Sequence, residues 1–356
     1  MGWFDRFRAK KKETFKERVE AFWAWWTEES ESLLARVGNS EDNESLQRDV
    51  GEAVTRLGLD FAWEFGPGPE GDGHSFALSP SGDRNRLFLV SYWRSRAPEL
   101  PGWTFHASRQ PFPESGDWAI NLGGTAVAPK DVLLDLAVDE EREVIHVFAW
   151  CEAFEELEED QARRHLFLLV DAVLGENGTE RWVGVIEQAD RRPDAAVPLS
   201  RLREWIQAAA TERGWEDRSP EDVYTVYGLE EPIGDFPRGD TIGGTTRNTS
   251  ILGAYLEEGG PIEDPVEGTG AEYLFAVVPG SVFPAGEETS VRAELEDALQ
   301  QRLGEAQSGM VLGGAMGRDA GYVDLLVFDG DRSRELIEEV FAARGLTGHR
   351  LESFVR

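Results

Sequence analysis

The sequence predicts an α+β protein of two tandem domains, in which helices cover antiparallel sheets and a helical hairpin comes first. Three observations lead to this fold class. Near the N-terminus, apolar residues recur every three or four positions, which is the helical period. After Gly58, short apolar segments alternate with turn residues, as strands do. The C-terminal half has the order β-α-β-β-α-β, which is typical of a ferredoxin-like domain.

The helical hairpin is predicted from two amphipathic segments. Apolar residues line one face of a helix over residues 15–37, and Gly38 ends it. The aromatic segment Phe22–Trp26 lies within this helix, and most of its rings fall on the apolar stripe, so we expect them in the core. Trp25 lies off the stripe, and it is either incidental or a contact residue for a partner. A second helix through Leu57 completes the hairpin.

Residues 1–18 form a basic arm in this prediction, because they hold seven basic and three acidic residues in a strongly acidic chain. Two roles remain open for the arm. With Trp3, Phe4 and Phe7 it could lie on an anionic membrane surface, which makes peripheral membrane contact a possible partner interaction. Alternatively, it rests on the acidic surface of the protein itself.

The domain boundaries follow from changes of pattern along the chain. Residues 19–187 form an N-terminal α+β domain whose strands begin with a hairpin, LDFAWEF and HSFALS. Residues 188–200 are polar and contain two prolines, so we expect a linker. Residues 201–356 form the C-terminal α+β domain, in which the ferredoxin-like unit begins with the strand EYLFAVV.

The charge and the cysteine content exclude several classes of protein. The net charge of -32, with 68 acidic and 36 basic residues, repels a phosphate backbone, so no nucleic-acid partner is expected. Cys151 is the one cysteine, so the chain has no internal disulfide and a reducing, cytoplasmic location is expected. No apolar run approaches the roughly 20 residues that span a bilayer, so no transmembrane segment is expected.

Familiar catalytic and cofactor motifs are missing from the sequence. The five histidines are too far apart for a short chelating motif, and there is no H-E-x-x-H. The chain has no G-x-S-x-G elbow, and GDTIGGTTRNT lacks the Lys of a phosphate-binding loop. We therefore assign no catalytic residue, no metal and no cofactor.

One carboxylate breaks the apolar pattern of a predicted strand. Asp324 lies in the middle of YVDLLVF, on the face that carries Tyr322 and Leu326. A carboxylate there must be paired or must face a wet groove. It is therefore either half of a structural ion pair or the acid of a ligand-binding site. The candidate partners are three arginines in Gly-rich loops: Arg238, Arg247 and Arg318.

Three stretches of the sequence carry a resemblance to known proteins. They are FWAWWTEESESL, ALSPSG followed by APELPGW, and FPRGDTIGG followed by GGAMG and GYVDLLVFD. Together they resemble a widespread set of uncharacterised bacterial proteins, from about Phe22 to the C-terminus. Because that set has no assigned activity, the resemblance implies a bacterial origin and a shared fold, and it supplies no catalytic residue.

These observations favour a non-enzymatic intracellular protein that binds a partner protein in a regulatory, stress or toxin-neutralising role. The alternative is a small-molecule-binding domain or hydrolase centred on Asp324. A pocket lined by Asp324 and an arginine would favour the alternative, whereas a flat surface would favour the protein partner.

We expect the stability of the protein to depend on salt. The acid excess, with five lysines among 36 basic residues, is explained either by a salt-rich cytoplasm or by a GC-rich genome that prefers arginine. In the first case, screening in molar KCl removes self-repulsion and raises the melting temperature by roughly 10 °C, which corresponds to several kcal/mol for a chain of this size. A sucrose series at matched osmolality is the control. A flat response to KCl would leave genome composition as the explanation.

Overall fold

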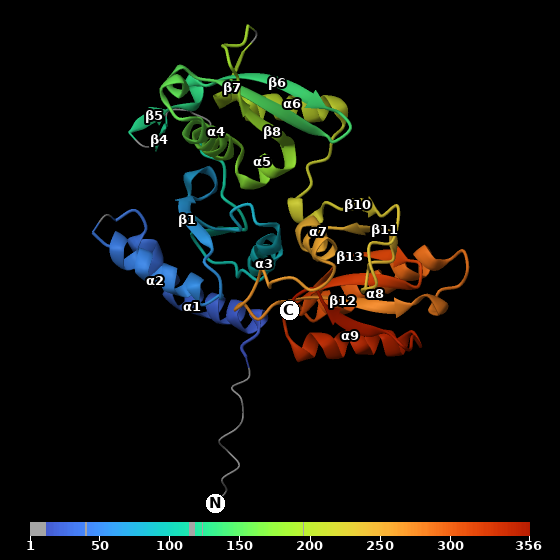
Figure 1. Cartoon of the computed structure of the whole chain (residues 1–356). Coiled ribbons are helices and arrows are strands. Elements are labelled where there is room, and N and C mark those ends of the chain that lie inside the picture. Colours follow the sequence, from blue (N-terminus) through green and yellow to red (C-terminus); the bar gives the residue numbers. More distant parts are fainter. Residues whose placement is uncertain (1–11, 40, 114–117, 123, 195) are drawn as a thin grey trace, which may run out of the picture. The chain divides into compact units, whose positions relative to one another are not determined.

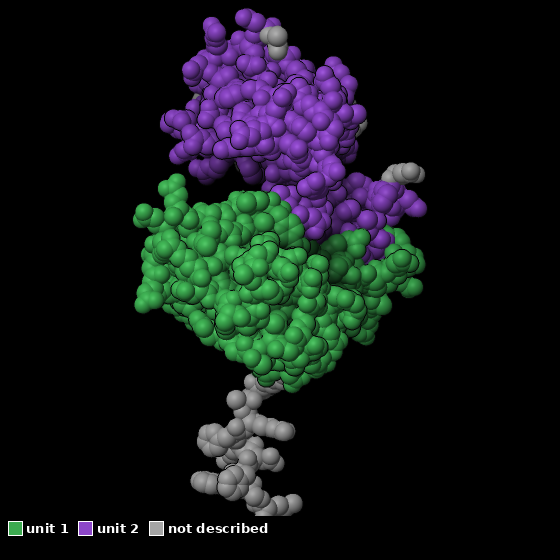
Figure 2. Space-filling model, turned by 90° about the vertical axis from the view of Figure 1, so that its right-hand side faces the viewer, with its two compact units in different colours: residues 1–61, 83–102, 224–356 green, residues 62–82, 103–223 purple. Residues whose placement is uncertain are grey.

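The structure is a computed structural model that describes residues 12–356 apart from residues 40, 114–117, 123 and 195 (Figure 1). The chain forms two compact units, coloured in Figure 2. Unit 1 comprises Met1–Phe61, Asp83–Gly102 and Tyr224–Arg356, and unit 2 comprises Ala62–Gly82 and Trp103–Val223. Both units combine helices with antiparallel strand pairs, so the predicted α+β class is confirmed.

The division into units does not coincide with the predicted domains 19–187 and 201–356. The predicted linker, residues 188–200, lies inside unit 2. There strand β9 (Val197–Pro198) pairs with strand β6 (Leu133–Asp139), and Leu199 is fully buried. Each unit is assembled from segments that are distant in sequence. The polar composition of 188–200 gave no sign of these long-range contacts, because a short edge strand needs few apolar residues.

The sheet of unit 1 has six strands, and every neighbouring pair is antiparallel. Their order across the sheet is β10-β11-β13-β14-β12-β15. The strands are β10 (Thr225–Gly228), β11 (Thr241–Thr246), β12 (Glu272–Pro279), β13 (Gly309–Gly317), β14 (Ala320–Val327) and β15 (Arg350–Ser353). Strands β12 to β15 follow the predicted order with helices α8 (Glu288–Glu305) and α9 (Asp331–Ala343) between them. The ferredoxin-like assignment stays a prediction, since β10, β11 and helix α7 (Thr249–Glu258) have no counterpart in it.

Helices cover both faces of this sheet, which explains why β14 is buried along its whole length. On one face, apolar residues of α8 and α9 pack against alternate residues of β12 and β14, such as Leu274 and Val323. On the other face, Tyr255 of α7 lies against Phe275, with ring centroids 5.5 Å apart. Tyr92 of helix α3 (Arg84–Ser95) stacks on Phe328 at 4.1 Å.

The aromatic N-terminal segment belongs to the core, as predicted. It lies in helix α1 (Phe15–Arg36), which is followed by helix α2 (Asn43–Thr55). Trp23 stacks on Trp93 of α3 with ring centroids 4.6 Å apart, and Trp26 is fully buried. These rings are buried inside unit 1, so they are not accessible to a binding partner.

The predicted basic arm, residues 1–18, overlaps helix α1, which begins at Phe15. A capping box fixes the start of α1, since the Glu17 N–H donates to Thr14 Oγ1 at 3.2 Å and the Thr14 N–H donates to Glu17 Oε2 at 2.8 Å. Phe15 is fully buried, and Lys16 Nζ donates to the Ala306 carbonyl at 3.0 Å. Counting charges did not reveal these contacts, because a single aromatic residue anchors the segment. Residues 1–11 of the arm lie outside the described residues.

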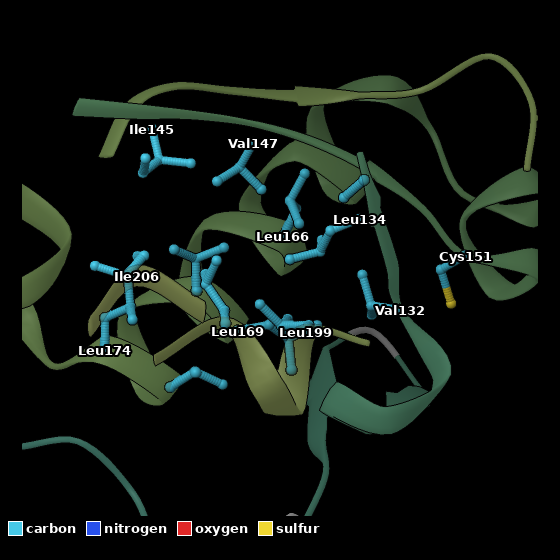
Figure 3. Close-up of a cluster of buried hydrophobic side chains, with 14 of the residues drawn as sticks. Val132, Leu134, Ile145, Val147, Cys151, Leu166, Leu169, Leu174, Leu199 and Ile206 are labelled. Carbon is cyan, nitrogen blue, oxygen red and sulfur yellow. The ribbon is translucent and has the colours of Figure 1, made fainter. Parts of the chain in front are cut away.

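Unit 2 is built around a four-stranded sheet with the order β8-β7-β6-β9. Alternate residues of β6 (Leu133–Asp139) and β7 (Val144–Trp150), such as Leu134, Ile145 and Val147, point into the core of Figure 3. There they face helix residues such as Leu166 and Leu169. The remaining elements are β1 (Ala62–Pro67), β2 (His74–Ser79), β3 (Trp103–His106), β4 (Ile120–Leu122), β5 (Thr125–Val127), β8 (Val183–Gln188), α4 (Glu159–Leu174), α5 (Glu176–Trp182) and α6 (Leu202–Arg213).

A buried carboxylate joins the separate segments of unit 2. Glu176 accepts hydrogen bonds from Ser79 Oγ at 2.7 Å, from the Gly82 N–H at 3.1 Å and from the Arg109 N–H at 3.1 Å. The guanidinium of Arg109 in turn lies 3.0 Å from Asp171. Burial raises the pKa of Asp171, and the charge of Arg109 opposes this shift. These bonds satisfy polar groups that would otherwise be buried without partners.

Among the described residues, no helix has both the length and the apolar character to cross a bilayer.

Removing the Phe15 ring should destabilise unit 1 strongly. The ring lies 5.9 Å from Tyr92 and 6.0 Å from Phe328, so Phe15→Ala opens a cavity and should cost about 3–5 kcal/mol in the free energy of unfolding. Thr14→Ala, which removes only the helix cap, should cost about 1 kcal/mol. Both values come from denaturant unfolding at one salt concentration. If Phe15→Ala costs no more than Thr14→Ala, residues 14–18 do not dock as described.

Candidate functional site

The candidate site of unit 1 begins with the carboxylate that the sequence singled out. Asp324 is the middle residue of the central strand β14, where its cross-strand neighbours are Phe275 and Gly313. Asp324 is only 2% exposed, so its charge must be compensated inside the protein.

Arg238 provides that compensation, and it was one of the three predicted partners. Its Nη1 donates to Asp324 Oδ1, and its side chain is fully buried. The guanidinium carbon lies 5.1 Å from the ring centroid of Tyr322 and 5.6 Å from those of Phe275 and Phe354. Rings at such distances attract a cation through their negative faces. The pair is therefore enclosed by aromatic rings.

The backbone around Arg238 is folded tightly to bring this side chain inward. Arg238 has a φ of 75°, a left-handed conformation that costs a non-glycine residue about 1–3 kcal/mol. The next residue, Gly239, passes so close to Gly234 that a Cβ would lie 2.4 Å from the Gly234 carbonyl oxygen. The buried ion pair holds this strained loop in place.

The same guanidinium reaches the edge of the sheet. Nη2 of Arg238 donates to the hydroxyl of Tyr227, on strand β10, at 2.5 Å. Burial raises the pKa of Tyr227 to about 12, so the hydroxyl keeps its proton and accepts this bond as a neutral group. One arginine thus links the central strand β14 to the edge strand β10.

Burial and the charge of Arg238 have opposite effects on the ionisation of Asp324. Burial raises the pKa of Asp324, and the charge of Arg238 opposes this shift. Oδ2 of Asp324 has no hydrogen-bond partner among the described residues. The open hollow next to the pair has a volume of about 810 Å³ and is lined by Asp240, Arg318 and Tyr322, but by neither Asp324 nor Arg238. Asp324 and Arg238 therefore line no part of this hollow.

The other two predicted arginines make different contacts in the structure. Arg247 donates to the Val311 carbonyl, and its guanidinium carbon lies 5.4 Å from the ring of Tyr224. Arg318 is exposed in the turn between β13 and β14, where its N–H donates to the Asp240 carbonyl at 3.1 Å.

Trp25 forms no part of this site in the structure. It is half-buried in α1, against Phe22 and Trp26, with ring centroids 6.1 Å and 5.8 Å away. It lines a separate hollow of about 150 Å³ together with Arg18 and Arg56. A contact role for Trp25 stays a prediction.

Strand β10 is the exposed part of the site, and the sequence analysis missed it. No strand among the described residues pairs with its outer edge. Val226 is 79% exposed and lies on the sheet face opposite to Tyr227, because strand side chains alternate. Tyr224, directly before the strand, is 51% exposed. The alternation in VYTVYG was the available signal, but a four-residue strand is too short to stand out.

The backbone of β10 also offers free hydrogen-bonding groups. The Leu229 N–H donates to the Ile242 carbonyl at 3.2 Å, which makes these two residues a hydrogen-bonded pair with β11. Antiparallel pairs alternate, so the N–H and C=O groups of Val226 and Gly228 point away from β11.

The two edges of the sheet differ in how they are protected. Edge strands are usually blunted by charged side chains or proline. The outer strand β15 follows this rule, because Arg350 and Glu352 form an ion pair at 2.7 Å on it. Strand β10 contains no charge and no proline. The strand is short, which limits the length of any added pairing. However, no charged side chain or proline in it prevents another strand from pairing with its outer edge.

The described residues contain no group of three or more His, Cys, Asp or Glu that is arranged to hold a metal ion. No protein-family model, curated protein or solved structure matches the chain. The resemblance to uncharacterised bacterial proteins gains no support from these comparisons. The site must therefore be interpreted from its own geometry.

Removing one partner of the buried pair should lower the free energy of unfolding strongly, and removing both partners should lower it less. Asp324→Asn leaves the Arg238 charge buried without a counter-charge, which should cost about 3–5 kcal/mol in the free energy of unfolding. The double variant Arg238→Met/Asp324→Leu removes both charges and should lose clearly less than the sum of the single variants. Chemical denaturation at fixed high salt measures all of them. An Asp324→Asn protein as stable as the wild type would favour a ligand-binding acid instead.

Proposed function

We propose that this chain binds a partner protein through strand β10, by adding an extended segment of the partner to the edge of the unit 1 sheet. The observation that carries the proposal is that edge strand β10 has exposed apolar side chains and free backbone groups. The other edge of the sheet, strand β15, carries charged side chains instead. Such edges bind extended peptides by main-chain hydrogen bonds, and the alternate side chains supply specificity.

The buried pair supports this function by keeping the edge in one conformation. Tyr227 anchors β10 through its hydroxyl, while the side chains of Val226 and Tyr224 remain exposed. A partner segment that meets a preformed strand orders only itself, which reduces the entropy lost on binding. Since β10 is short, we expect micromolar dissociation constants. These correspond to a binding free energy on the order of -8 kcal/mol.

A small-molecule site centred on Asp324 is less well supported, because the carboxylate is enclosed with Arg238 and lines no part of the neighbouring hollow. The regulatory, stress or toxin-neutralising role expected from the sequence stays a prediction.

A peptide-display selection tests the proposal with a matched pair of variants. Val226→Pro removes an outward N–H without touching the pairing with β11, so it should block strand addition and cost no more than about 1 kcal/mol of stability. Phe167→Lys removes another exposed apolar side chain, 47% exposed, from helix α4 in unit 2, and serves as the control.

We expect the wild type and the Phe167→Lys variant to select peptides with alternating apolar residues, and the Val226→Pro variant to lose them at least tenfold. The melting curve of each variant establishes that it is folded. Equal binding of the selected peptides by Val226→Pro would refute the proposal, as would the absence of any selected extended peptide.

A further inference from the structure

The charges that follow strand β10 carry an inference about the chemistry of its partner. From Tyr224 to Phe236 the sequence contains three acidic residues and no basic one. These acids, Glu230, Glu231 and Asp235, are all exposed. None of them forms an ion pair with another described residue. The open edge therefore ends in an uncompensated acidic loop.

The two buried arginines near strand β10 do not neutralise this loop. Arg238 is fully buried and committed to Asp324 and Tyr227. Arg247 is also buried, beneath the ring of Tyr224, where it donates to the backbone of β13. Both guanidinium groups are directed into the protein, so the charged side chains exposed between Gly228 and Phe236 are all acidic.

Resting on the proposed function, we infer that the partner segment is basic at one end and apolar in its middle, and that it adds antiparallel to β10. Every neighbouring pair in the unit 1 sheet is antiparallel, and antiparallel pairing is the more stable arrangement per residue. In that orientation the N-terminal end of the segment lies beside the C-terminal end of β10. Its basic residues then lie next to Glu230 and Glu231, and its apolar residues lie beside Val226 and Tyr224.

A second copy of this chain fits the same edge less well. The β10 strand of another copy would bring its own acidic loop and no basic residue between Tyr224 and Phe236. Like charges in an interface suppress pairing, whereas opposite charges steer association and fix its register.

Three labelled peptides with blocked termini test the inference by fluorescence anisotropy: KKTVTVT, its reversal TVTVTKK, and EETVTVT. The measurements use the lowest salt concentration at which the protein remains folded. We expect KKTVTVT to bind at least tenfold more tightly than EETVTVT and more tightly than TVTVTKK. The preference should shrink as salt is added, because screening weakens the exposed charge pairs.

Two variants separate this inference from the function on which it rests. The double variant Glu230→Gln/Glu231→Gln should abolish the preference for KKTVTVT while leaving a common weak affinity for all three peptides. Val226→Pro should remove the binding of all three.

If EETVTVT and KKTVTVT bind the wild type equally and Val226→Pro still abolishes both, the basic partner is refuted and strand addition stands. If TVTVTKK binds best, the antiparallel orientation is refuted. If Val226→Pro binds the peptides as the wild type does, or if none of them binds, both ideas fail. Dimerisation of the wild type that is lost in Val226→Pro would identify a second copy as the occupant and refute the basic partner.

Discussion

The buried ion pair between Arg238 and Asp324 is the interaction on which the open edge of unit 1 depends. Asp324 is fixed in the central strand of the sheet, and Arg238 extends from it to Tyr227 on the edge strand. The pair therefore joins segments that are 86 and 11 residues apart in sequence. Burying two charges costs several kcal/mol per ion, which the pair offsets only with additional hydrogen bonds and nearby rings. Its main consequence is to select one conformation of a strained loop.

That conformation gives the sheet two chemically different edges. Strand β15 carries charged residues, whereas β10 presents Val226 and free backbone groups. An edge of this kind is usually an aggregation hazard, and acidic surroundings are one way to limit self-association. The loop after β10 supplies such surroundings through Glu230 and Glu231. The same charges that disfavour pairing with another copy favour a basic segment. Protection against self-association and selectivity for a basic partner therefore have the same electrostatic origin.

Buried carboxylates affect how the stability of the protein depends on pH. Burial raises the pKa of Asp171 in unit 2 and of Asp324 in unit 1, and each carboxylate lies against an arginine. The pKa of such a carboxyl group is higher in the folded state than in the unfolded state. Between these two pKa values, the folded state therefore binds more protons than the unfolded state. Such groups therefore contribute less stability at neutral pH than at mildly acidic pH. The arginines limit this loss, which explains why acids occupy the interior in pairs with a cation.

The sequence by itself determined the α+β class, the amphipathic helices and the anomaly at Asp324, because each depends on a local period or on a single residue that breaks it. It also supplied Arg238 as one of three possible partners. Only the tertiary structure decided among Arg238, Arg247 and Arg318, since the choice depends on a left-handed backbone at Arg238 and on contacts across 86 residues. The division into units and the edge strand β10 were likewise beyond local patterns. Both depend on which distant segments pair, and short strands and polar linkers carry too few apolar residues to specify that pairing in advance.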